Sequence, residues 1–154
     1  MEEFFKNIPK EVEKKLIEIQ WFEFFEDFRI NCLNRNYNFC HKAAMLLKDA
    51  KEDELSKQLL KMNCIDSENA NPNTPKIIFA SSCWTLGCIL SQENRWPESL
   101  EYYKHACDVN RHPRACYNLG YAHRKGLTEN AVKNAFLARK YFRISCLNYS
   151  HAKR

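Results

Sequence analysis

The stretch that decides the fold is residues 99–120, SLEYYKHACDVNRHPRACYNLG. It reads as the end of one helix, a short loop and the start of the next helix, with a cysteine on each side of the loop. Both halves of this stretch recur along the chain. The copies of the first half are Phe28-Arg29-x-x-Cys32, Leu60-Lys61-x-x-Cys64, Tyr103-Lys104-x-x-Cys107 and Phe142-Arg143-x-x-Cys146. The copies of the second half, Cys-x-x-Leu-Gly, are residues 83–87, 116–120 and, in degenerate form, 40–44. The sequence therefore predicts an array of helix pairs.

The composition limits the class of protein. The 154 residues are 45% hydrophobic and 13% aromatic, with a mean hydropathy of -0.60, which predicts one folded domain. No run of about 18 apolar residues occurs, so we expect no transmembrane helix. The net charge of +5 is spread over the whole chain rather than clustered in a basic arm, which argues against a nucleic-acid partner. The first 15 residues, MEEFFKNIPKEVEKK, resemble neither a secretory signal nor a transit peptide.

The order of the segments predicts a single all-α domain over residues 1–154, built from antiparallel helix pairs. Its parts are a capping helix at 1–33, repeat one at 34–64, an inserted loop at 65–76, repeat two at 77–110, repeat three at 111–148 and a tail at 149–154. Pro97 and Pro113 stand where helices should begin, and Gly126 where one should end. The last helix is expected to begin near Asn130. Its inward-facing residues should be Ala131, Ala135, Ala138 and Phe142, joined by Leu127.

The predicted capping helix is unusually aromatic. Its apolar residues recur at steps of three and four, as in an amphipathic helix. One interpretation is that the aromatic stripe is buried on the next helix pair. The other is that part of it, including Trp21 and Phe24, is an exposed docking face for a partner.

Two of the three glycines, Gly87 and Gly120, occupy the same place in successive repeats. Glycine inside a helix costs about 1 kcal/mol relative to alanine. We therefore expect a neighbouring helix to approach closely at both positions.

The last two repeats resemble a known family. The run Ala115-x-x-x-Leu119-Gly120-x-x-His123-x-x-Gly126, followed by Ala138-x-x-Tyr141-Phe142-Arg143-x-x-Cys146, is similar to a Sel1-like repeat, a relative of the tetratricopeptide repeat. The cysteines resemble the disulfide-rich branch, which includes the Helicobacter cysteine-rich proteins and mitochondrial assembly factors of cytochrome c oxidase. This resemblance implies an α-solenoid whose first helices line a concave face. It also implies a scaffold of the mitochondrial intermembrane space, where disulfide formation retains proteins that lack presequences.

Eight cysteines recurring with the repeat favour an oxidising compartment. The end of one helix pair lies next to the start of the following pair, so we prefer the cross-loop disulfides Cys32–Cys40, Cys64–Cys83 and Cys107–Cys116. This scheme leaves Cys88 and Cys146 as free thiols. The alternative joins the ends of one pair, as Cys40–Cys64, Cys83–Cys107 and Cys116–Cys146. No closely spaced ligand pair typical of zinc or copper occurs, so we predict no metal site and no cofactor.

No catalytic residue is predicted, because no nucleophile elbow, phosphate loop or metalloprotease motif is present. The favoured function is an assembly factor for a respiratory complex, or an accessory subunit of one, cytochrome c oxidase first among them. Its protein partners would contact the aromatic first helix and the concave face. The candidate residues on that face are Trp84, Tyr117, Tyr121 and Arg124. Two alternatives remain. One is an enzyme, either a thiol oxidoreductase that uses Cys88 or a labile disulfide, or a hydrolase; the other is a cytosolic Sel1 adaptor with reduced thiols.

Overall fold

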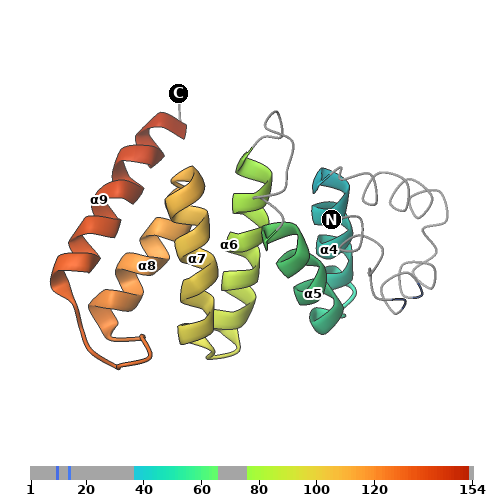
Figure 1. The fold of residues 1–154 in the computed structure, drawn as a ribbon, viewed down its shortest axis with the longest axis horizontal. Coiled ribbons are helices and arrows are strands. Elements are labelled where there is room, and N and C mark those ends of the chain that lie inside the picture. The colour runs from blue at the N-terminus through green and yellow to red at the C-terminus, as the bar shows by residue number, and fades with distance from the viewer. Residues whose placement is uncertain (1–9, 11–13, 15–36, 66–75, 153–154) are drawn as a thin grey trace. The chain divides into compact units, whose positions relative to one another are not determined.

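The computed structural model describes residues 37–65 and 76–152, together with Lys10 and Lys14. The predicted capping helix, with Trp21, Phe24 and Cys32, and most of the predicted inserted loop lie outside these residues. The described part is helical and contains no strand (Figure 1). The prediction of an all-α protein is therefore confirmed for this part of the chain. None of its helices is both long enough and apolar enough to cross a bilayer.

The described residues form six helices. They are α4 (Tyr37–Asp49), α5 (Asp53–Ile65), α6 (Lys76–Gln92), α7 (Trp96–Asn110), α8 (Pro113–Lys125) and α9 (Ala135–Ala152). The chain divides into two compact units, Met1–Phe79 and Ala80–Arg154, with the boundary inside α6. The prediction of one domain with the repeat boundaries given above stays a prediction.

In the first unit, α4 and α5 pack against each other. Small residues make the contact close: Ala43 and Ala44 of α4 are completely buried. Ser56 of α5 is also buried, and its hydroxyl donates a hydrogen bond of 2.7 Å to the Ala44 carbonyl. This bond satisfies a buried polar group and ties the second helix to the backbone of the first.

Three of the described helices, α4, α6 and α8, end in the same kind of turn. After α4, α6 and α8, one residue adopts the left-handed conformation, with φ of 61°, 61° and 70°. These residues are Lys51, Asn94 and Gly126. The next N–H donates to the carbonyl five residues back, at 2.9 Å each time: Glu52 to Leu47, Arg95 to Leu90 and Leu127 to Ala122. This turn satisfies a carbonyl at the helix end and reverses the chain into the next helix.

In the second unit, α7 packs on α8 and α8 packs on α9 (Figure 1). Pro97 and Pro113 lie in the first turns of α7 and α8, as predicted. The two helix-interior glycines each face an aromatic ring. A Cβ atom at Gly87 would lie 2.6 Å from a ring carbon of Tyr103 in α7, and one at Gly120 would lie 2.8 Å from the ring of Phe142 in α9. The expected close approach therefore occurs, and it is made by an aromatic side chain.

The predicted start of the last helix is wrong. The helix begins at Ala135 rather than near Asn130. Ala131 has a φ of 53° and is exposed, so it belongs to the loop. The loop is held because the Asn134 N–H donates to the His123 carbonyl at 2.8 Å, while the Asn134 side chain accepts from the Leu137 N–H at 3.0 Å and caps the helix. Ala135 is exposed as well, and of the predicted inward-facing residues only Ala138 is fully buried.

Candidate functional site

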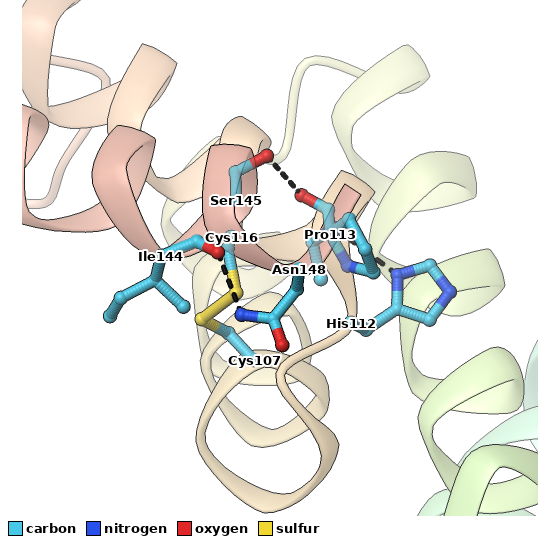
Figure 2. Close-up of a disulfide and its surroundings, with 8 residues drawn as sticks. Cys107, His112, Pro113, Cys116, Ile144, Ser145 and Asn148 are labelled. Carbon is cyan, nitrogen blue, oxygen red and sulfur yellow. Dashed lines mark hydrogen bonds between the residues drawn. A yellow bond between two sulfur atoms is a disulfide. The ribbon is translucent and has the colours of Figure 1, made fainter. Parts of the chain in front are cut away.

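The best-defined feature of the second unit is a disulfide corner, which we define as Cys107, Cys116 and the loop between them (Figure 2). Cys107 lies in the last turn of α7 and Cys116 in the first turn of α8, with their Cα atoms 5.0 Å apart. Both are completely buried. The Ser145 hydroxyl of α9 donates a 2.8 Å hydrogen bond to the Pro113 carbonyl of this corner. The corner therefore joins the end of α7 to the start of α8 and is hydrogen-bonded to α9.

The remaining described cysteines fall into two groups. Cys40, Cys64 and Cys83 are each disulfide-bonded. Cys88 and Cys146 form no disulfide; the first is half-buried in α6 and the second is exposed on α9. The bond from Cys107 to Cys116 rules out the alternative pairing of Cys107 with Cys83 and of Cys116 with Cys146.

His112 caps α8 inside the corner. Its Nδ1 accepts a hydrogen bond of 3.3 Å from the Ala115 N–H (Figure 2). Burial, and secondarily the positive charge of Arg114, lower the pKa of His112 to about 4. The ring is therefore neutral at pH 7, which leaves Nδ1 available as the acceptor that the helix start needs.

A stack of side chains covers this histidine. The Trp84 ring of α6 stacks on the His112 ring, with centroids 5.3 Å apart and an angle of 20° between the ring planes. The Arg114 guanidinium lies 5.4 Å from the Trp84 ring centroid, and its Nε donates to the Tyr149 hydroxyl at 3.3 Å. Side chains from α6, α8 and α9 thus meet over the corner.

This arrangement predicts that stability depends on His112 between pH 4 and 6.5. The pKa is lower in the folded protein than in the unfolded chain, so the unfolded chain binds more protons in this range. The contribution of neutral His112 to the free energy of unfolding is fully present above pH 6.5, and it is lost as the pH falls toward 4. We expect a loss of about 1 kcal/mol between pH 7 and 5, after allowing for the partial exposure of the ring.

Urea unfolding at both pH values measures this loss. His112→Asn is the matched control, because asparagine also caps helices but does not titrate. The variant should lose less stability than the parent on going from pH 7 to 5. Equal losses in the two proteins would show that His112 is not the group responsible.

Of the predicted partner-binding residues that the structure describes, one is half-buried and three are exposed. Trp84 is half-buried within the stack described above. Tyr117, Tyr121 and Arg124 are exposed and follow one another at steps of four and three, so they form a stripe on α8. The Tyr117 side chain is 52% exposed although its ring contacts that of Phe142. We call these three residues the α8 stripe.

Two exposed apolar residues of α9 are missing from the sequence-based candidates. Phe136 is 72% exposed and Leu147 is 58% exposed. Charge also gathers here: residues 124–143 hold six basic residues and one acidic residue, a net +5 that equals the net charge of the whole chain. The expectation that the charge is spread over the whole chain is therefore wrong. Counting charged residues in successive segments of the sequence would have found this basic segment.

No family model, curated protein or solved structure matches the chain. The candidate site is therefore assigned from its residues alone: a covalently closed corner, and next to it the exposed surfaces of α8 and α9.

Proposed function

We propose that the chain is a non-catalytic scaffold of the mitochondrial intermembrane space that holds protein partners. In this proposal it is a disulfide-crosslinked α-solenoid of the Sel1-like, tetratricopeptide-related type. It acts as an assembly factor for a respiratory complex or as an accessory subunit, with cytochrome c oxidase the first candidate.

The observation that carries the proposal is the bond between Cys107 and Cys116. It joins the end of one helix pair to the start of the next, at the position where the repeat places its cysteines. Buried disulfides of this kind persist in oxidising compartments and are rare in the cytosol. The repeated helix ends at Lys51, Asn94 and Gly126 support the same architecture.

The α8 stripe supports the interaction role. Tyrosine and arginine are enriched among the residues that dominate binding energy at protein interfaces. Tyr121 is positioned by a ring contact with Trp96 of α7, with centroids 5.8 Å apart, and Tyr117 by its contact with Phe142. A surface whose aromatic groups are already positioned loses less conformational entropy on binding.

The compartment is tested by the redox state of the protein in its own cells. Thiols are alkylated before lysis, and the peptides are analysed by mass spectrometry with and without reduction. Cys107 and Cys116 should be modified only after reduction, while the exposed thiol of Cys146 should be modified in both samples and serves as the internal control. Modification of Cys107 without reduction would favour the cytosolic adaptor, and cell fractionation would show where the protein resides.

The partner is tested by purification of the tagged protein under mild conditions. Subunits of a respiratory complex should be recovered with it. The double variant Tyr117→Ala/Arg124→Glu should reduce their recovery by at least about tenfold, as expected for the loss of two interface residues. Lys104→Glu, an exposed charge reversal on α7, should leave recovery unchanged. Equal recovery with all three proteins would overturn the role of the α8 stripe.

A further inference from the structure

The exposed side of α9 combines apolar and basic residues along one line. Phe136, Lys140, Arg143 and Leu147 are spaced by four, three and four residues, and all four are exposed. This spacing places them on one side of the helix over about 16 Å. We call these four residues the α9 ridge.

The opposite side of α9 is already used in the fold. Ala138, Tyr141 and Ser145 are buried, and the helix packs on α8. The 18 residues of α9 include Arg139, Lys140 and Arg143 but no aspartate or glutamate. Lys140 lies over the ring of Tyr141, with its Nζ 5.6 Å from the centroid. The ridge therefore presents positive charge between two apolar side chains, without an acidic residue in the same helix.

From this surface we infer that the α9 ridge binds an acidic amphipathic helix of a protein partner. The inference deepens the proposed function, and it rests on only one part of it, namely that the partner is a protein. The partner helix would place apolar side chains against Phe136 and Leu147 and carboxylates against Lys140 and Arg143. Helices commonly dock in this way, through anchors spaced by about one turn.

The order of residues along the ridge distinguishes this partner from a lipid surface. An interfacial helix inserts its apolar residues while its bases stay at the level of the headgroups. On the ridge the bases lie between the apolar residues, so insertion of Phe136 and Leu147 would carry Lys140 and Arg143 toward the hydrocarbon, where charged side chains are costly. A second copy of the chain is disfavoured because two such ridges would oppose like charges.

The test uses the full chain and a fluorescently labelled helical peptide of about twenty residues. The peptide carries leucine at two positions eleven residues apart and glutamate four and seven residues after the first leucine. This pattern reads the same in both directions, so it matches the ridge in either orientation. Fluorescence anisotropy measures binding at low and at physiological salt. A peptide with lysine in place of both glutamates is the ligand control.

The acidic peptide should bind and the lysine peptide should not. Lys140→Glu/Arg143→Glu should weaken binding by at least about tenfold, and Phe136→Ala/Leu147→Ala by about tenfold, because each pair removes one component of the contact. Lys61→Glu/Lys104→Glu, with the same change in net charge at exposed sites on α5 and α7, should have little effect. Unchanged thermal unfolding of the ridge variants shows that the fold is retained, since their side chains are exposed.

Three results would overturn the inference. They are equal binding of both peptides or of neither, ridge-dependent binding to anionic phosphatidylglycerol vesicles in place of the peptide, and a dimer in sedimentation that Phe136→Ala/Leu147→Ala abolishes. The assay uses purified protein, so its failure leaves the compartment and the α8 stripe to be judged by their own experiments.

Discussion

Gly87→Ala is expected to lower the free energy of unfolding by about 1–3 kcal/mol, although alanine favours a helix by about 1 kcal/mol over glycine. The new Cβ atom would lie 2.6 and 2.7 Å from two ring carbons of Tyr103. That ring cannot move away easily, because Tyr103 is 1% exposed and its hydroxyl lies 3.1 Å from the Ser91 Oγ, within hydrogen-bond distance. Overpacking in a filled core therefore outweighs the gain in helix propensity.

The chain itself supplies the control for this prediction. At the corresponding positions repeat one has Ala44 and Leu60, both completely buried, in place of Gly87 and Tyr103. Alanine is thus expected to be tolerated where the opposing residue is leucine. In a Tyr103→Leu background, Gly87→Ala should be neutral or stabilising in urea unfolding. If Gly87→Ala stabilises the parent protein, the ring contact is not the reason for the glycine.

Removal of the disulfide between Cys107 and Cys116 should lower the free energy of unfolding by about 2–3 kcal/mol. The bond closes a loop between residues separated by nine positions. In the chain-entropy model, opening a loop of this size restores freedom to the unfolded chain by about that amount. Cys107→Ala/Cys116→Ala removes the disulfide and replaces each buried cysteine by alanine. Because alanine is also small and apolar, other effects on the core are limited.

Urea unfolding of this double variant measures the effect. Cys146→Ala is the matched control, because Cys146 is an exposed free thiol at the same place in the next repeat. It should leave stability unchanged within about 0.5 kcal/mol. A double variant as stable as the parent would show that the hydrogen bond from Ser145 and the packing of α7 on α8 hold the corner without the bond.

Several features of this protein could be predicted from short stretches of sequence. Pro97 and Pro113 mark the beginnings of α7 and α8, and Gly126 marks the end of α8. These signals are local, because a proline ring or a left-handed glycine acts on the backbone at its own position. The recurring cysteines predicted where a disulfide could form, but they left two possible partners for Cys107.

Other features depend on residues far apart in the sequence. The start of α9 at Ala135 is set partly by the bond from Asn134 to His123, and Ala131 looked like a helical residue by spacing alone. Helical periodicity also cannot tell a buried face from an exposed one, so Ala135 was expected to face inward although it is exposed.

By itself, therefore, the sequence determined the helices, their order and the positions of the cysteines, since backbone preferences act over a few residues. The tertiary structure alone decided that Cys107 bonds to Cys116, that Gly87 and Gly120 each face an aromatic ring, and that one side of α9 stays exposed. The physical reason is that disulfide pairing, burial and exposure depend on which helices pack against each other. Backbone preferences that act over a few residues do not specify this packing.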